Sequence, residues 1–262
     1  MKDFVPWLIG PYASQRKFRQ FCEIGARTGA TSARLLELDG ATLSIIDPCE
    51  DDDLITRFEG DSRVKVIKGF SLDVLPVLTD TFDAFLIDGD HNWYTVYHEL
   101  AVIHDRSLLK PGGVIFLHDT AWPYGRRDMY FDPGRIPKEY VQPHERRGIV
   151  RGQPDLADSG VNAHHYNALH EGGPRNGVLT AVEDFAREHK GGYIRYSLDV
   201  QFGITMLHRC GRPEEDWMFE RFTRSISRRI RIGAWKQRMD RIVPGAVPLY
   251  RAVRRLFRRN SP

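Results

Sequence analysis

Short apolar runs alternate with segments of helical spacing between residues 21 and 120. The apolar runs predict strands, and the segments between them begin with polar residues and often stop at glycine, as helices do. Predicted strands cover residues 21–26, 42–48, 63–69, 82–89 and 114–120, and predicted helices cover 31–40, 51–60, 71–80 and 95–110. Strands separated by helices favour a doubly wound, Rossmann-like α/β fold with a parallel sheet.

The alternation stops after Thr120. Residues 121–177 are rich in Pro, Gly, Arg, His and Tyr and are too long for a plain connection, so they predict an insertion or lid that shapes a binding site. Residues 178–190 then predict a helix, and residues 193–200 and 202–209 predict a closing pair of strands that includes an antiparallel one. We expect one domain over residues 1–212, followed by basic C-terminal helices over 213–262.

The composition is that of a globular protein, because 41% of the 262 residues are hydrophobic and 28% are charged. No apolar run reaches the roughly 18 residues of a membrane-spanning helix. The first residues lack a signal-peptide pattern, since Pro6 and Pro11 interrupt a short apolar stretch. Three cysteines without a CxxC pair indicate a reducing compartment. These features predict a cytoplasmic protein.

The net charge of +3 conceals an asymmetry. From Arg221 onward the chain carries twelve arginines and one lysine against the single acid Asp240. Apolar residues in this tail recur at helical spacing, which predicts two amphipathic helices separated by residues 243–248. Such helices would pack on the body, pack on a second copy in a homo-oligomer, or contact an anionic membrane surface. A basic tail alone gives no specificity for nucleic acid.

Glycines and acids follow the predicted strands where a parallel sheet binds its ligands. Gly25 and Gly29 allow a tight turn, and Thr31 opens the next helix with a hydroxyl and an amide that suit an anionic group. Asp47 ends the second strand, where an acid can hold ribose hydroxyls. Ser71 follows the third strand, where it can flank an adenine ring.

Two acids end neighbouring strands, Asp88 after residues 82–87 and Asp119 after residues 114–118. Strands in a sheet lie about 4.8 Å apart, so two carboxylates there repel each other unless a cation or a shared proton compensates. A hard divalent ion such as Mg²⁺ fits this site. His118 could add a nitrogen ligand, which would shift the preference toward Mn²⁺, Fe²⁺ or Zn²⁺, or could point away.

The ordered motifs EIGARTGATS, IIDP, KGFSLDVLP, FLIDGDH and LKPGGVIFLHD resemble class I S-adenosylmethionine-dependent methyltransferases. Among them, the chain is most similar to the metal-dependent catechol O-methyltransferase-like group and its bacterial relatives that modify sugars and antibiotics. The resemblance covers about residues 20–120.

The resemblance implies a role for each matching residue. The cofactor-binding residues are Glu23, Gly25, Gly29, Thr31, Asp47, Ser71 and Asp88, and the metal ligands are Asp88, His118 and Asp119. Glu23 would either contact the cofactor or anchor its loop. The group usually has two oxygen-bearing residues at positions 118 and 119, so His118 is a departure from its pattern.

The expected reaction is methyl transfer from the sulfonium to an oxygen, with a base that takes the hydroxyl proton. Asp90 and His91 are the two candidates, because relatives that modify sugars place an aspartate at the first position and catechol-type enzymes place a lysine at the second. Either could instead cap the helix that follows. We expect a sugar or glycosylated acceptor in a pocket lined by aromatic and basic residues of the insertion, where Arg126 and Arg127 could meet an anionic group.

Other functions remain as alternatives. A small phenol or catechol is the second class of acceptor. A nicotinamide-dependent oxidoreductase is disfavoured, because the loop reads GxxxG in place of GxGxxG. A non-catalytic protein that binds RNA or membranes on the same fold would need the cofactor loop or the acids to be missing, and both are present.

Overall fold

A computed structural model describes residues 1–49 and 53–242, with side chains to residue 232. The chain divides into two compact units, Met1–Asp216 and Trp217–Pro262. The first unit contains every predicted site residue. In the described part of the chain no helix is long and apolar enough to cross a membrane.

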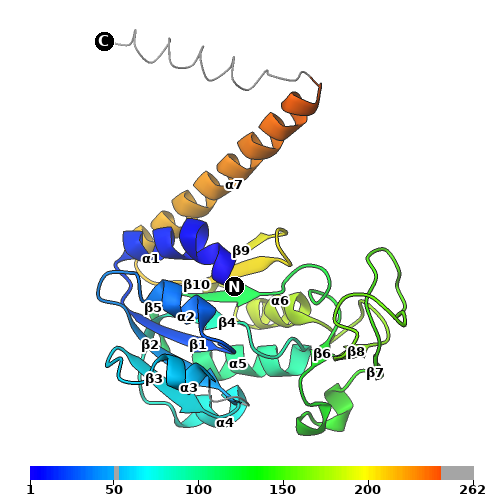
Figure 1. The fold of residues 1–262 in the computed structure, drawn as a ribbon. Coiled ribbons are helices and arrows are strands. Elements are labelled where there is room, and N and C mark those ends of the chain that lie inside the picture. The colour runs from blue at the N-terminus through cyan, green and yellow to red at the C-terminus, as the bar shows by residue number, and fades with distance from the viewer. Residues whose placement is uncertain (50–52, 243–262) are drawn as a thin grey trace. The chain divides into compact units, whose positions relative to one another are not determined.

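The first unit is built on a seven-stranded sheet in the order β3-β2-β1-β4-β5-β10-β9 (Figure 1). Strands β1 to β5 are parallel, and β10 runs antiparallel to both β5 and β9. The strands are β1 Gln20–Ile24, β2 Thr42–Asp47, β3 Val64–Lys68, β4 Phe82–Ile87, β5 Leu109–His118, β9 Tyr193–Leu198 and β10 Ile204–Arg209. The predicted fold class is therefore confirmed, with its parallel sheet and its antiparallel closing strand.

The helices lie between the strands, as the sequence pattern predicts, but most are shorter. They are α1 Gly10–Arg16, α2 Ala30–Leu35, α3 Asp53–Arg57, α4 Ser71–Val74, α5 Trp93–Asp105 and α6 Val178–Glu188. Short 3-10 or π segments occupy η1 Lys2–Phe4, η2 Val5–Ile9 and η3 Leu75–Val77. The sequence analysis assigned no element to residues 1–16, which are helical. It also started the fifth strand at residue 114, whereas β5 begins at Leu109 and pairs with Phe82 across a register shift.

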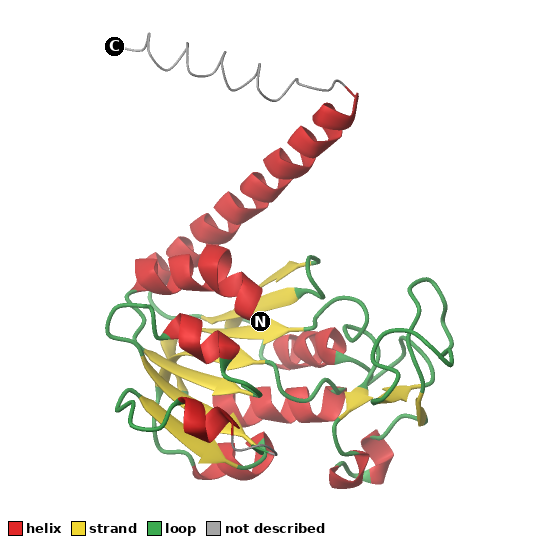
Figure 2. Cartoon of the chain, in the orientation of Figure 1, coloured by secondary structure: helices red, strands yellow, loops and turns green. Residues whose placement is uncertain are grey.

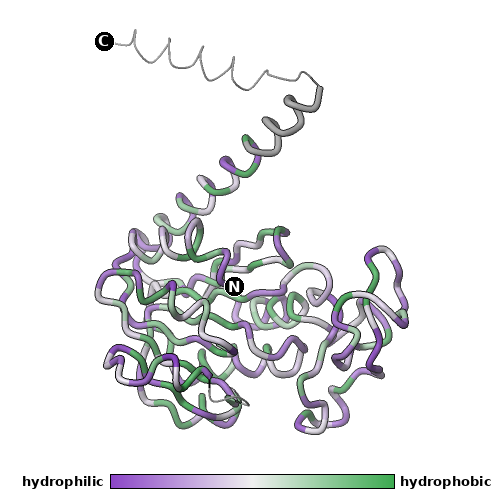
Figure 3. The backbone as a smooth tube through the Cα atoms, in the orientation of Figure 1, coloured by the Kyte–Doolittle hydropathy of each residue, from purple (hydrophilic) through white to green (hydrophobic). Residues whose placement is uncertain are grey.

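The core surrounds the two central strands. Ala84, Phe85 and Leu86 of β4 are fully buried, as are Ile115 and Phe116 of β5. Such continuous apolar strands are typical of parallel sheets covered on both faces. Helix α6 adds a buried face of Val178, Ala181, Val182 and Phe185, and Figure 3 shows hydrophobic positions along this helix and the strands beside it.

Residues 119–177 form mainly loops, drawn green in Figure 2, around a three-stranded sheet. This small sheet has the order β6-β8-β7, with β6 Met129–Tyr130, β7 His144–Arg146 and β8 Tyr166–Ala168, and the 3-10 segments η4 Pro133–Arg135 and η5 Lys138–Tyr140 lie between β6 and β7. Arg127 is fully buried and donates to the carbonyl groups of Pro154, Ala168 and Leu169. The prediction that Arg127 meets an anionic acceptor is therefore wrong, because its guanidinium holds the loops of the insertion together.

Asp128 anchors the insertion to two helices. Its carboxylate accepts hydrogen bonds from the backbone N–H of Trp93 at 2.8 Å and of Gly177 at 2.6 Å, and from the hydroxyl of Tyr130 at 2.9 Å. Trp93 begins α5 and Gly177 immediately precedes α6. One buried carboxylate thus joins the insertion to the start of both helices.

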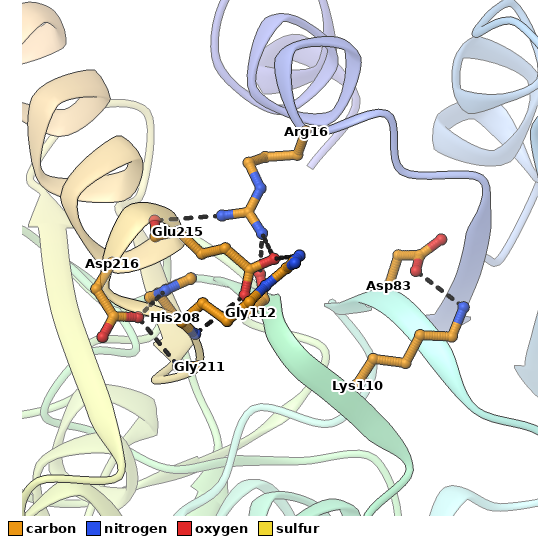
Figure 4. A network of polar contacts seen from close by, with 9 residues as sticks. Arg16, Asp83, Lys110, Gly112, His208, Gly211, Glu215 and Asp216 are labelled. Carbon is orange, nitrogen blue, oxygen red and sulfur yellow. Dashed lines mark hydrogen bonds and ion pairs between the residues drawn. The ribbon is translucent and has the colours of Figure 1, made fainter.

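A second polar network lies at the opposite end of the strands (Figure 4). Arg16 at the end of α1 donates to the Gly112 carbonyl at 3.1 Å and forms an ion pair with Glu215 at 3.0 Å. Its side chain is only 6% exposed and that of Glu215 only 16%. Nearby, His208 pairs with Asp216 at 2.9 Å. The network fixes α1 to the first half of β5 through Gly112 and to Glu215.

The second unit is described by α7, which spans Pro213–Ile242 and so begins within the first unit. Phe219, Phe222 and Ile226 are buried and Arg221 and Arg224 are exposed, so the predicted helical spacing is present here. The second predicted amphipathic helix, around residues 249–257, lies outside the described residues. The suggested partners of the tail stay predictions.

Candidate active site

The loop after β1 and the loop after β4 touch through two glycines. Gly25 has a φ of +80°, and a Cβ at this position would lie 2.2 Å from the Cα of Gly89. Its N–H donates to Ile46 on β2, while the N–H of Asp88 donates to Ile24 on β1. The turn that the sequence analysis placed at Gly25 is therefore required by close backbone packing at the end of the sheet.

Gly29 and Thr31 form the start of α2. Gly29 has a φ of +70°, and a Cβ there would lie 2.5 Å from the ring of Phe58. Glu23, which is 1% exposed, accepts a short hydrogen bond from Ser32 and also lies beside the Thr31 hydroxyl. Burial raises the pKa of Glu23 to about 7, although these hydroxyls oppose the shift. These contacts are those of a residue that anchors the loop, and the contact of Glu23 with the cofactor stays a prediction.

Asp47 holds two loop backbones at the end of β2. Its carboxylate accepts from the N–H of Arg27 and from the N–H of Cys49, each at 2.8 Å. Both donors have positive φ angles, 52° for Arg27 and 49° for Cys49, a conformation that is unfavourable for these residue types. Each carboxylate oxygen keeps a lone pair for a further donor, as the ribose-binding prediction requires.

Ser71 begins α4 and lies near Glu99, which the sequence analysis did not select. Glu99 on α5 is fully buried, and neither of its oxygens has a partner at hydrogen-bond distance among the described residues. Burial raises its pKa to about 8, and the Ser71 hydroxyl opposes part of this shift. Glu99 shares the apolar face of Val96, Leu100 and Ile103, so an acid on that face was the available signal.

Four side chains converge where β4 and β5 end. His91 Nε2 lies 2.7 Å from Asp119 Oδ2 and 3.8 Å from Asp88 Oδ1. His118 Nδ1 lies 2.8 Å from the same oxygen of Asp119 and 3.0 Å from Asp88 Oδ1. Asp119 adopts a φ of +55°. The predicted carboxylate pair therefore exists, with an imidazole on either side; we call these four residues the strand-end cluster.

The strand-end cluster is electrostatically coupled. Burial opposes the charge on each group, but the neighbouring charges and hydrogen bonds outweigh it. They hold the pKa of Asp88 well below its usual range and lower that of Asp119 to about 2. They also raise the pKa of His91 to about 10 and that of His118 to about 9. The N-terminal ammonium of Met1, 3.1 Å from Asp88 Oδ2, adds a third positive charge beside the two carboxylates.

The donor set suits a divalent transition metal. One ligand atom from each of Asp88, His91 and Asp119 lies within 4.8 Å of the others. The buried Nδ1 of His91 has no hydrogen-bond partner among the described residues, so the protein itself does not use this ring nitrogen. Two carboxylates with an imidazole favour Mn²⁺, Fe²⁺ or Zn²⁺ over Mg²⁺, which prefers an all-oxygen shell.

Asp90 has contacts unlike those of the cluster. Its carboxylate accepts from the N–H of His91 at 3.0 Å, from Asn92 Nδ2 at 2.6 Å, from Thr95 Oγ1 at 3.3 Å and from the N–H of Phe131 at 3.1 Å. Asn92 caps α5 by accepting from the N–H of Thr95. Four donors on Asp90 favour the helix-capping role over that of a free base.

A hollow of about 270 Å³ adjoins Thr120, the residue after Asp119. The insertion contributes Trp122 and Arg126, and the loop after β9 contributes Asp199. Other lining residues are Ala121, Gly125, Glu171, Leu179, Ser197 and Leu198. Residues of the insertion thus line a hollow that adjoins the residue after Asp119, and its use as the acceptor pocket stays a prediction.

Known proteins resemble this arrangement. Residues 22–120 match the methyltransferase domain family, a segment that runs from β1 through Asp119. Residues 22–120 of the chain are thus similar to a methyltransferase domain, in agreement with the resemblance of the sequence motifs. The fold agrees with the S-adenosylhomocysteine-bound methyltransferase PaMTH1 of Podospora anserina, with a TM-score of 0.50 and 20% identity over 75% of this chain and 74% of that one.

Two further proteins are similar to this chain. The O-methyltransferase hkm8 of Aspergillus hancockii is 26% identical over 124 residues, which are 44% of this chain and 48% of that protein. The chain thus spans about half the length of this curated relative. A protein described as a caffeoyl-CoA O-methyltransferase of Staphylococcus aureus aligns with a TM-score of 0.48 at 15% identity, over 77% of this chain and 80% of that one.

Proposed function

We propose that this methyltransferase transfers the methyl group of S-adenosylmethionine to a hydroxyl oxygen of a sugar or glycosylated acceptor, with the help of a divalent metal. The observation that carries the proposal is the strand-end cluster beside the Gly25 loop. In a parallel sheet, ligands bind at the carboxyl ends of the strands, which is where both features lie. The O-methyltransferase relative supports the same class of reaction.

The reaction needs three elements from the chain. The cofactor would occupy the loops of Gly25, Asp47 and Ser71, with its ribose on Asp47. As the carbon–sulfur bond of the sulfonium breaks, a carbon–oxygen bond forms, the hydroxyl proton passes to an imidazole, and S-adenosylhomocysteine leaves. A divalent ion bound to the cluster would lower the pKa of the acceptor hydroxyl and fix its oxygen.

We assign exchanged roles to the two histidines. From the sequence, His118 is a metal ligand and His91 a candidate base. In the structure the ligand atoms of Asp88, His91 and Asp119 lie within 4.8 Å of one another, and His118 Nδ1 also lies 3.0 Å from Asp88 and 2.8 Å from Asp119, so either imidazole can reach a metal held by the two carboxylates. His118 remains beside both carboxylates and is the group that we assign to proton acceptance. It accepts a proton only when neutral, which requires that the two carboxylates raising its pKa be neutralised.

A polar acceptor matches the hollow beside Thr120. Arg126, Glu171, Ser197 and Asp199 offer donors and acceptors, and Trp122 offers an aromatic face. Arg126 already pairs with Glu183 at 2.7 Å, so its charge is balanced and its remaining N–H groups suit hydroxyls better than an anion. This lining suits a sugar more than an apolar phenol.

The test is calorimetry of S-adenosylhomocysteine and of Mn²⁺, with wild type, Asp119→Asn, His91→Gln and His118→Gln. We expect all variants to bind the cofactor product, the first two variants to lose Mn²⁺ affinity, and His118→Gln to keep it while losing turnover. If only His118→Gln lost Mn²⁺ affinity, His118 would be the metal ligand and His91 the candidate base, as the sequence predicts. If wild type bound no S-adenosylhomocysteine, the proposed reaction would be wrong. A panel of sugars and catechols then decides the acceptor class.

A further inference from the structure

A second group of metal-ligating side chains lies at the opposite end of α5 from the strand-end cluster. His104 and Asp105 occupy the last turn of α5, and His189 follows the end of α6. One ligand atom from each of the three lies within 4.8 Å of the others. Helix α5 has 13 residues and is therefore about 20 Å long, so the two groups are separate sites.

We infer that His104, Asp105 and His189 form a binding site for a divalent transition metal such as Zn²⁺, which joins the ends of α5 and α6. The two helices pack side by side (Figure 1). Two imidazoles and one carboxylate are a donor set that Zn²⁺ accepts, with water as a fourth ligand. Hard cations such as Mg²⁺ prefer oxygen ligands and would bind poorly here.

The imidazoles are held in a form suited to metal binding. A metal on Nε2 requires that Nδ1 carry hydrogen, and each Nδ1 lies beside an oxygen that can accept it. His189 Nδ1 is 3.0 Å from the Phe185 carbonyl oxygen, and His104 Nδ1 is 3.2 Å from the Tyr193 hydroxyl. Such outer contacts orient the rings of metal-binding histidines.

The surroundings are rigid and electrostatically favourable. The two imidazole rings lie 4.2 Å apart between centroids, and Phe185 stacks on His189 at 4.3 Å. Both helices end at this point, and helix C-termini favour a positive charge. Arg209 opposes a cation, but its guanidinium is engaged with the Leu109 carbonyl.

The site is accessible from solvent, since His104 and His189 are half-buried and Asp105 is exposed. A metal here would cross-link α5, α6 and the loop that leads into β9. Because it binds the folded chain and not its unfolded form, it would raise the melting temperature.

The test is zinc calorimetry on the full chain after removal of metals, in an Asp119→Asn background that weakens the strand-end cluster. We expect this background to bind one equivalent of Zn²⁺ and to melt at a higher temperature with Zn²⁺ than without. Adding His104→Gln and His189→Gln should remove both effects. Adding His170→Gln, a matched control whose side chain is 75% exposed and lies 3.7 Å from Asp155, should leave both unchanged.

Because Asp105 is exposed, its substitution should not impair folding. Asp105→Asn should weaken Zn²⁺ binding by about tenfold or more in the same background, with the melting temperature of the metal-free chain unchanged. If the Asp119→Asn chain bound no Zn²⁺, or bound it equally with and without the two histidines, the inference would be overturned. Neither result depends on the methyltransferase reaction.

Discussion

Gly25 and Gly89 meet where β1 and β4 end, so closely that a methyl group on Gly25 would lie 2.2 Å from the Cα of Gly89. The contact joins the predicted cofactor loop to the chain segment that carries Asp88. Any displacement of one loop therefore moves the other, and the cofactor and the strand-end cluster share one piece of backbone.

The first prediction concerns this contact. Gly25→Ala should weaken S-adenosylhomocysteine binding by at least about tenfold, roughly 1.4 kcal/mol, because the loop must move apart. Gly60→Ala is a matched control, since Gly60 has nearly the same φ, +79° against +80°, but nothing within 4 Å of the added carbon. Equal binding losses in both variants, measured by calorimetry, would show that backbone strain rather than crowding is responsible.

The second prediction concerns Asp128. Asp128→Asn removes one acceptor from a buried carboxylate that holds Trp93, Gly177 and Tyr130. We expect kcat/KM for the acceptor to fall at least about tenfold, because small displacements of binding groups are costly to catalysis, while the Kd for S-adenosylhomocysteine stays unchanged. Limited trypsin digestion should also cleave the insertion faster. Asp132→Asn, an exposed change in the same insertion, is the control.

The third prediction is a pH dependence of stability. Burial raises the pKa of Glu99 to about 8, above its usual value of 4.5, so the folded protein retains a proton that the unfolded chain releases. The contribution of Glu99 to stability should therefore fall as pH rises from about 4.5, with a slope of up to about 1.4 kcal/mol per pH unit, and level off above pH 8.

Glu99→Gln tests this pH dependence because glutamine does not titrate. The difference in unfolding free energy between wild type and variant, from urea titrations across this range, should grow with pH in favour of the variant. Glu23, whose pKa is also raised, contributes equally to both proteins and cancels. A difference that is independent of pH would mean that Glu99 is ionised throughout.

The fourth prediction concerns the network of Figure 4. Arg16→Ala should lower the unfolding free energy by about 2 kcal/mol, because it leaves the Gly112 carbonyl without its charged donor and removes the buried one of the two arginines that pair with Glu215. Arg187→Ala removes an ion pair with Asp184 in which the arginine side chain is 73% exposed. It should cost less than about 1 kcal/mol. Similar losses in both variants would contradict the importance of burial at Arg16.

The sequence predicted the structural features that depend on the spacing of apolar residues and on the order of the strands along the chain. Apolar runs identified all seven strands of the main sheet, and the acids Asp88 and Asp119 could be placed together because parallel strands end at one edge. The domain boundary and the roles of the site residues stay predictions, although the structure brings Asp88, His91, His118 and Asp119 together.

What the sequence could not give depends on tertiary contacts. The sequence does not distinguish the buried Arg127 from a surface arginine. The carbonyl groups that it binds come from residues 154, 168 and 169, which are far from it along the chain. The contacts that hold Asp90 beside the start of α5 include the N–H of Phe131, forty-one residues away. Residues 1–16 lack a long periodic pattern because their helical segments are short and contain Pro6 and Pro11.

The anchoring of the insertion by Asp128 has a consequence for how acceptor preference can change. Loop sequences between residues 131 and 175 can vary without disturbing the sheet, provided that the Arg127–Asp128 pair and Gly177 are kept. Grafting this segment from a related enzyme should therefore transfer acceptor preference only when both junctions lie between Asp128 and Gly177, so that these three residues of the host are kept. Arg127 and Asp128 thus form a fixed attachment point, and the segment attached to them is the exchangeable part of the protein.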